Sequence, residues 1–138
     1  MYLDPEIWGP YYWFTLHTIA LSYPNKPNET IKKKYYNFIQ NLPLFIPNEK
    51  IGNDFCNLLD KYPITPYLDS KKSFMEWMHF IHNKINEKLY KKQISFQEAL
   101  QLYYEKYQVK YSKKPSYNKI YYIFISIILL ILIYFMYN

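Results

Sequence analysis

The stretch Phe74–Leu89, F-M-E-W-M-H-F-I-H-N-K-I-N-E-K-L, decides the fold. Apolar residues recur in it at intervals of three and four, the spacing that places side chains on one face of an α-helix. The members of this stripe are Phe74, Trp77, Met78, Ile81, Ile85 and Leu89. We therefore predict a helix that buries this face and runs to about Tyr90.

A polar row lies beside the stripe and consists of His79, His82, Asn83 and Asn86. Hydrogen-bonding side chains along the edge of a core-facing helix would suit a polar, planar ligand. Taken alone, the row also fits an ordinary solvated surface, since exposed Asn and His are common. His79 and His82 lack an obvious third partner, so we predict no metal site.

Four further helices are predicted around this one. The first runs from Pro10 to about Tyr23, and the second is capped by Asn28 and ends near Asn41. The third covers roughly Asn48–Lys61, and the last begins with the capping box Ser95–Glu98 and ends near Val109. Their predicted inward residues are Trp13, Leu16, Ala20 and Tyr23, then Ile31, Tyr35, Phe38 and Ile39, then Ile51, Phe55, Leu58 and Leu59. Because no stretch alternates with period two, the predicted fold class is all-α, a four-helix bundle followed by a short fifth helix.

Composition excludes several function classes. The 138 residues carry a net charge of +6, but the lysines are scattered and form no base-reading motif, so we predict no nucleic-acid partner. With only two glycines, the chain has no Gly-rich phosphate loop. The one cysteine, Cys56, excludes an internal disulfide and a cysteine-rich zinc site. We expect it to be a small buried hydrophobe.

The segment 120–137 has no charged residue and is rich in Ile and Leu, with Tyr at both ends. Its 18 residues would span about 27 Å as a helix, enough for a bilayer core. We predict a helical domain at 1–109, a basic linker at 110–119 and a single transmembrane helix at 120–137. A span this late must insert after translation, which leaves the helical domain on the cytosolic side. The adjoining lysines agree with that side: Lys110, Lys113, Lys114 and Lys119.

Two motifs carry a family resemblance. The segment 8–24 reads W-G-P-Y-Y-W-F-T-L-H-T-I-A-L-S-Y-P, and 82–89 reads H-N-K-I-N-E-K-L. Together they resemble the first and fourth helices of the Erv/ALR family of FAD-linked sulfhydryl oxidases, which includes members carried by large DNA viruses. That family has W-G-x-x-x-W-x-x-L-H and H-N-x-V-N-x-K-L in the same order. The resemblance covers about Trp8–Tyr107 and implies a helical bundle that holds FAD, commonly as a homodimer.

The resemblance assigns residues to the cofactor. It implies flavin contacts at Gly9, Trp13, His17, His82, Asn83, Asn86 and Lys88, and it places the family's late tryptophan near Tyr107. Aromatic rings suit the ring systems of FAD, amides and imidazoles suit their edges, and Lys88 or Lys91 would neutralise the diphosphate. The chain departs from the family after Leu89, where Tyr90-Lys91-Lys92 replaces Gly-Lys-Pro.

A larger departure concerns the redox cysteines. The family has a reactive C-x-x-C after a proline at the start of its third helix. If Pro47 is that proline, the register to His82 needs no gap, and the two cysteine positions hold Asn48 and Ile51. An amide and a sec-butyl group cannot act as thiols. Cys56, five residues beyond Ile51, has no partner within the chain.

The sequence therefore leaves the enzymatic status open. The favoured hypothesis is a membrane-anchored FAD-linked sulfhydryl oxidase homologue with impaired or absent catalysis, which forms a homodimer or pairs with an active thiol oxidase in a host or virion membrane. A second hypothesis is thiol oxidation through Cys56 across a dimer. A third is a non-enzymatic membrane adaptor that binds no flavin.

Overall fold

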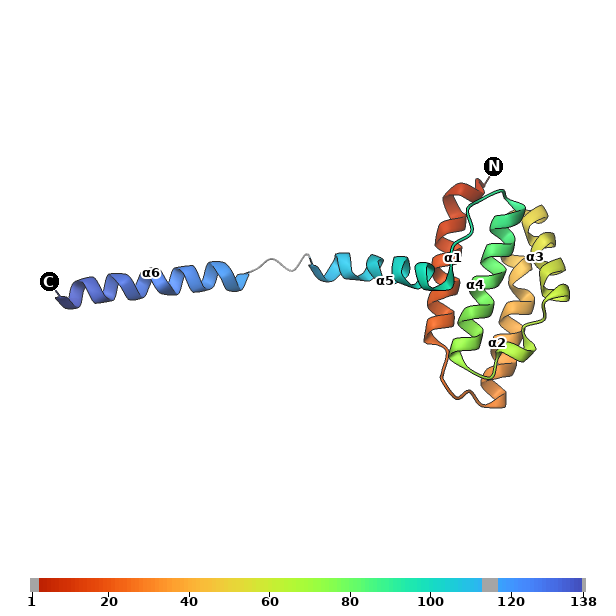
Figure 1. The fold of residues 1–138 in the computed structure, drawn as a ribbon, viewed down its shortest axis with the longest axis horizontal. Helices are drawn as coiled ribbons and strands as arrows, with labels where there is room; N and C mark the ends of the chain where they lie inside the picture. The colour runs from red at the N-terminus through yellow and green to blue at the C-terminus, as the bar shows by residue number, and fades with distance from the viewer. Residues whose placement is uncertain (1–2, 113–116, 138) are drawn as a thin grey trace. The chain divides into compact units, whose positions relative to one another are not determined.

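The computed structural model describes residues 3–112 and 117–137, and within these ranges the chain forms helices and no strand. The elements in chain order are α1 (Pro5–Ser22), α2 (Glu29–Asn41), η1 (Leu42–Phe45), α3 (Glu49–Lys61), η2 (Thr65–Tyr67), α4 (Lys71–Lys88), α5 (Phe96–Ser112) and α6 (Tyr117–Tyr137), where η marks a 3₁₀ turn. The first four α-helices lie side by side as a bundle (Figure 1). The predicted all-α fold, with a bundle, a fifth helix and a separate apolar helix, is confirmed.

Side-chain caps start three of the bundle helices, and the cap predicted for α2 is confirmed. The caps are Asn28 for α2, Asn48 for α3 and Ser70 for α4. In each case the side-chain oxygen accepts a hydrogen bond from the backbone N–H three residues further on. Such a cap satisfies one of the N–H groups that a helix leaves unpaired in its first turn, so these residues fix where the helices begin.

The first helix begins five residues earlier than predicted. Asp4 accepts a hydrogen bond from the Glu6 N–H at 2.9 Å, and Pro5 occupies the first turn. Pro10, which was predicted for that position, lies inside α1 instead. Both prolines precede the same apolar stripe and either suits a first turn, so the sequence pattern alone could not choose between them.

The α4 stripe lies at the centre of the core. Five of its six members are buried, and Leu89 is the exception at 39 % exposed because it follows the last helical residue. Phe38 of α2 was predicted to face inward and is also 39 % exposed, whereas its neighbour Ile39 is fully buried. The buried core residues are Leu16, Ala20, Tyr23, Ile39, Leu42, Phe55, Leu58, Leu59, Ile64, Leu68, Phe74, Trp77, Met78, Ile81 and Ile85.

Two polar aromatic residues of this core keep their hydrogen bonds. The Tyr23 hydroxyl donates to the Leu68 carbonyl at 2.7 Å, and the Trp77 indole N–H donates to the Tyr62 carbonyl at 3.1 Å. A buried hydroxyl or indole N–H without a partner would be destabilising, so these bonds allow the large rings to be buried. They also tie α1 and α4 to the connection between α3 and α4.

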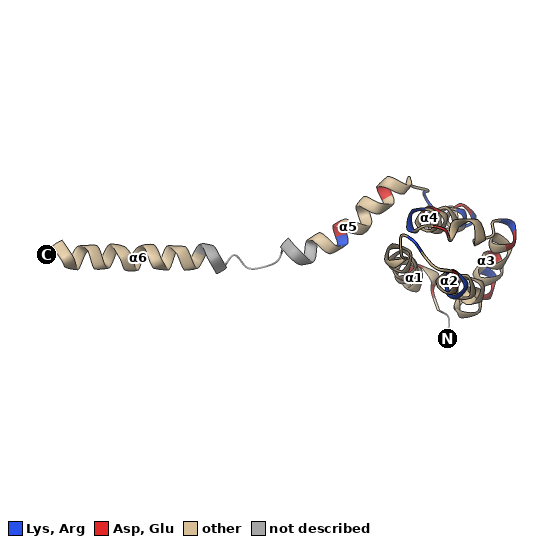
Figure 2. Ribbon diagram, turned by 90° about the horizontal axis from the view of Figure 1, so that it is seen from below, with Lys and Arg blue, Asp and Glu red and all other residues tan. Residues whose placement is uncertain are grey.

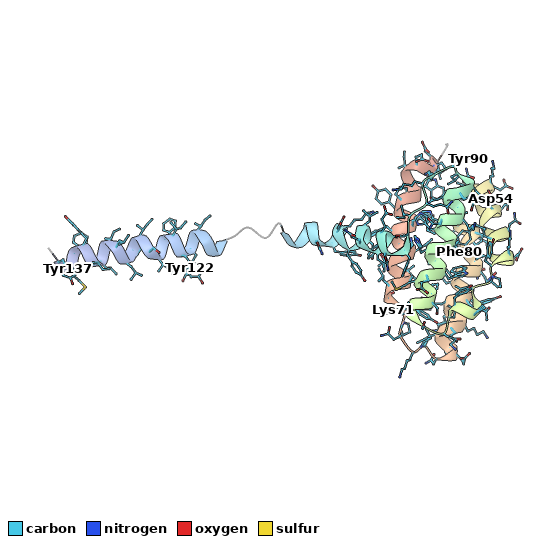
Figure 3. All side chains as sticks on the ribbon, in the orientation of Figure 1. Asp54, Lys71, Phe80, Tyr90, Tyr122 and Tyr137 are labelled. Atoms are coloured by element: carbon cyan, nitrogen blue, oxygen red, sulfur yellow. The ribbon has the colours of Figure 1, made fainter. Side chains whose placement is uncertain are left out.

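The C-terminal end of α4 turns back through a left-handed residue. Tyr90 has φ of 54°, and the Lys91 N–H donates to the Asn86 carbonyl at 2.8 Å. This backbone conformation suits glycine and costs a residue with a Cβ about 1–2 kcal/mol. The Tyr90 side chain is 99 % exposed (Figure 3), so burial does not offset the strain.

Replacing Tyr90 by glycine should therefore stabilise the domain. We expect Tyr90→Gly to raise the free energy of unfolding by about 0.5–1 kcal/mol, because relief of strain exceeds the extra freedom of glycine in the unfolded chain. Urea unfolding of the full chain in detergent, followed by tryptophan fluorescence, measures the change. Gln93→Gly in the same connection is the control and should not stabilise. A Tyr90→Gly variant less stable than the parent would contradict the assignment of strain.

The chain divides into two compact units, Met1–Gln101 and Leu102–Asn138. The second unit contains α6, whose segment Ile120–Tyr137 is long and apolar enough to cross a membrane and has none of its length buried. Figure 2 shows no charged residue along this segment, and Figure 3 shows its side chains projecting on all sides. Of the predicted linker 110–119, residues 113–116 lie outside the described ranges.

Candidate functional site

Three rings from α1 and α4 meet at the edge of the core. The indole of Trp13 stacks on the imidazole of His82, with ring centroids 3.9 Å apart and planes 9° from parallel. The His17 Nε2 atom lies 3.0 Å from the His82 Nδ1 atom, so one ring donates a hydrogen bond to the other. Trp13 and His17 lie four residues apart on α1, and their rings are 6.1 Å apart and tilted. His82 is the stacking partner of Trp13.

The environment of His82 disfavours a positive charge. Its pKa is lowered to about 3, first because burial penalises the imidazolium and then because His17, His79 and Lys91 repel it. A neutral His82 can share one proton with His17. Two imidazolium rings would face each other donor to donor, so the pair requires at least one neutral ring.

The low pKa of His82 makes stability depend on pH. Because the pKa of the folded state, about 3, lies below the ordinary value of 6.5, the unfolded chain binds more protons between these values. The contribution of His82 to the free energy of unfolding is therefore complete above pH 6.5 and declines as the pH falls toward 3.

We expect the unfolding free energy of the parent to fall more steeply between pH 7.5 and 4.5 than that of His82→Phe, which keeps a flat ring but cannot titrate. Urea unfolding at several pH values measures both slopes, and equal slopes would contradict this assignment.

Asn83 and His79 face the segment that connects α4 to α5. The Asn83 side-chain amide donates to the Ile94 carbonyl at 2.9 Å, and His79 Nε2 lies 3.0 Å from the same oxygen. Asn86 is half-buried one turn beyond His82. The sequence pattern predicted that these α4 residues form one polar row, but it did not predict their contact with Ile94. That contact is made by a backbone carbonyl, which every residue has, so the sequence carries no signal for it.

Two lysines near the end of α4 form ion pairs with carboxylates. Lys88 pairs with Asp54 of α3, and Lys91 pairs with Glu6 of α1 at 2.7 Å. Figure 3 places Asp54 and Tyr90 toward the same end of the bundle. Ion pairs this exposed contribute about 0–1 kcal/mol, so either lysine can exchange its partner for another anion at little cost.

The remaining predicted site residues lie in two places. Gly9 is in α1, and no described atom beyond its own local helix lies within 4 Å of where a side chain would begin, so the helix backbone is open there. Tyr107 is on α5 in the second unit, where its hydroxyl lies 2.9 Å from that of Tyr103. The structure thus brings Trp13, His17 and His82 into contact within the first unit.

The N-terminus of α3 is closed by an amide. The Asn48 side chain accepts a hydrogen bond from the Ile51 N–H at 3.0 Å. The two positions that the resemblance assigns to reactive cysteines are therefore joined by a helix cap. Cys56, on the same helix, is exposed and free, so the prediction that it is buried was wrong. It follows Phe55 on α3 but falls on the side away from the core.

Comparison with known proteins identifies the family. The sequence model of the Erv1/Alr family matches residues 10–114.

The chain belongs to the Erv1/Alr family.

Among its relatives, a protein of Acanthamoeba polyphaga mimivirus named as a probable FAD-linked sulfhydryl oxidase, R368, is 35 % identical over 117 residues, covering 84 % of this chain and 80 % of the relative. The FAD-linked sulfhydryl oxidase of African swine fever virus is 31 % identical over 96 residues, covering 70 % of this chain and 79 % of the relative.

The Erv1/Alr fold also matches solved structures. The core of yeast Erv1 superimposes with a TM-score of 0.65 at 28 % identity, covering 70 % of this chain and 80 % of that one. The FAD-binding domain of Erv1 from Saccharomyces cerevisiae gives the same score and identity and is covered to 90 %. These matches confirm the family resemblance inferred from the two sequence motifs.

Proposed function

We propose that this chain is a membrane-anchored, FAD-binding member of the Erv1/Alr family that does not oxidise thiols by the route of a C-x-x-C pair. The observation that carries the proposal is the cap at the start of α3, where the Asn48 amide bonds the Ile51 N–H at 3.0 Å. These positions serve the fold of α3 and hold no sulfur.

The rings on α1 and α4 fit a flavin cofactor. Trp13, His17 and His82 offer flat surfaces and ring nitrogens, which suit the stacking and edge hydrogen bonds of an aromatic heterocycle. The open backbone at Gly9 gives a ligand close access to α1. When bound, FAD would supply the capacity to accept electrons and pass them to oxygen. The chain's own part is to hold neutral rings in a partly dry site.

Polar residues beside Trp13, His17 and His82 would complete the proposed flavin-binding site, which we call the flavin seat. The Asn83 side chain lies beside the rings and contacts both Ile94 and His79, and Asn86 lies one turn further along α4. Lys88 and Lys91 sit in exposed ion pairs that a diphosphate can replace. The family resemblance also assigns a flavin contact to Tyr107 on α5, and that assignment stays a prediction.

Loss of the sulfur pair removes the electron donor of the family's reaction. Disulfide formation withdraws two electrons and two protons from two thiols, and the thiolate form is the reactive one. Asn48 and Ile51 can form neither a thiolate nor an S–S bond. Cys56 supplies one exposed thiol, and a single thiol cannot close a disulfide within the chain.

We place the flavin domain at 1–109, a basic linker at 110–119 and the anchor at 120–137, with the domain on the cytosolic side of a host or virion membrane. The apolar length of α6 supports the anchor, and the basic linker supports the sidedness. A pair with an active thiol oxidase would let that partner supply the missing dithiol, whereas a homodimer would bring only one Cys56 thiol from each copy.

The direct test is flavin content with oxygen uptake on one sample. We expect the full chain purified in detergent to be yellow and to consume no more oxygen with dithiothreitol than free FAD does. Asn48→Cys/Ile51→Cys should keep the flavin and gain oxygen uptake. The matched control is Asn48→Ser/Ile51→Ser, which is close in size but has no sulfur and should stay inactive. Unfolding is measured in parallel, because loss of the Asn48 cap costs about 1 kcal/mol.

Two other results would overturn parts of the proposal. Steady oxygen uptake by the parent chain that Cys56→Ser abolishes would favour thiol oxidation through Cys56. A folded parent chain without absorbance at flavin wavelengths, even after incubation with FAD, would favour the non-enzymatic adaptor. An active parent that is insensitive to Cys56→Ser would contradict both the proposal and the Cys56 route.

A further inference from the structure

Residues 89–95, which connect α4 to α5, are fastened by side chains and are called the strap below. The backbone carbonyl of Ile94 accepts from the Asn83 amide at 2.9 Å and lies 3.0 Å from His79 Nε2. The Ile94 N–H donates to the Asn83 side-chain oxygen at 3.4 Å. Both backbone polar groups of one strap residue are therefore satisfied by two α4 side chains, which lie one helical turn apart.

His79 Nε2 lies 3.0 Å from the Ile94 carbonyl oxygen and 3.1 Å from the Asn83 amide nitrogen. A carbonyl oxygen can only accept, so the contact with Ile94 is a hydrogen bond when Nε2 carries the proton, and Nδ1 is then a bare acceptor. His79 is only 7 % exposed, and its Nδ1 atom has no hydrogen-bond partner in the part of the chain that the structure describes. The ring also packs against Phe96, the first residue of α5, with centroids 5.6 Å apart. His79 thus contacts both the last part of the strap and the start of α5.

The other end of the strap is fastened to α1. The Lys91 ammonium pairs with Glu6 at 2.7 Å, and the Lys91 N–H closes the end of α4. Lys91 also lies close enough to His82 to repel a charge there. The strap therefore runs from a contact with α1 to a contact with α4, and Figure 1 draws it as the thin connection between the end of α4 and the start of α5.

We infer that His79 is a positioning residue that locks the strap, through Ile94, as one side of the flavin seat. This inference rests on the proposed function for the flavin seat. The contacts that hold the strap, from His79 and Asn83 to Ile94, are called the lock, and they are present whether or not a flavin binds. The sequence pattern gave His79 no role of its own, and the family resemblance assigns it no flavin contact. It acts on a ligand only by fixing the backbone of residues 89–95 and the first turn of α5.

The lock requires a neutral His79, and its surroundings favour that form. The pKa of His79 is lowered by burial, against a smaller opposite effect of the bond to Ile94. The titratable group coupled to it is His82 on the same helix, and the strap next to it carries Lys91 with its partner Glu6. The exposed pair Lys92–Glu98 lies beyond them. A second ring proton would sit on the unpartnered Nδ1 atom, so acidification below about 6.5, the ordinary value for histidine, opposes the locked state.

The test compares two replacements in the full chain in detergent. His79→Phe keeps a buried ring but removes the donor, whereas His79→Gln keeps a neutral N–H donor that does not titrate. Phe80→Leu is the control on the same helix, since the Phe80 ring contacts Tyr62 rather than the strap. Two quantities are measured between pH 5 and 8: the dissociation constant for FAD, and amide hydrogen exchange in the peptide covering the strap.

Above pH 6.5 we expect His79→Phe to raise the dissociation constant about tenfold over the parent and to speed exchange in the strap, because one net hydrogen bond to a buried carbonyl is lost. The difference from the parent should narrow as the pH falls. The parent should lose FAD and strap protection as the pH falls below 6.5, and His79→Gln should show a smaller pH dependence than the parent. Phe80→Leu should follow the parent.

The inference is overturned if His79→Phe retains both the FAD affinity and the strap protection of the parent, or if His79→Gln keeps the full pH dependence. If no chain binds FAD, the proposed function fails, and hydrogen exchange in the strap still decides whether His79 locks it. If FAD binds normally while strap protection is lost, the strap is not a side of the seat.

Discussion

Burial of the α4 stripe against α1 is the constraint on which the rest of the structure depends. The stripe brings α4 beside α1 with Leu16 and Ala20 in the same core, and this contact fixes the register between the two helices. Trp13 and His17 then meet His82 at the edge of the buried surface, where burial disfavours the charged form of His82. The stacking of Trp13 on His82 is a consequence of the core and would not survive a shift of one helix by a turn.

The elements of the bundle could be predicted because each has a local cause. Asn28 caps α2 as predicted, Asn48 and Ser70 supply the same kind of cap to α3 and α4, and the period of three and four in α4 marks its buried face. The start of α1 could not be predicted in the same way, since Asp4-Pro5 and Pro10 offer competing first turns. Phe38 and Leu89 share the period of their helices, yet both lie at the margin of the core, where the helical period alone cannot tell a buried position from an exposed one.

The residues of the candidate site could be predicted from the sequence, but most of the contacts between them could not. Trp13, His17 and His82 could be expected together from the family motifs, but their pairing depends on a tertiary contact between residues 65 positions apart in the chain. His79 and Ile94 went unrecognised as partners because a backbone carbonyl in a connection has no sequence signal. Tyr90 shows the opposite case. Its left-handed φ is the conformation that glycine adopts without strain, and glycine is the residue that the resemblance puts at this point.

The amide that begins α3 has a consequence for where the domain can fold. A domain closed by a disulfide or dependent on a dithiol changes with the glutathione poise of its compartment. This chain has one cysteine, and it is exposed on the outer side of a helix. Helix α3 begins with the hydrogen bond from the Ile51 N–H to the Asn48 side chain, and neither an oxidant nor a reductant alters that amide. The bundle should therefore reach the same fold in a reducing cytosol as in an oxidising one.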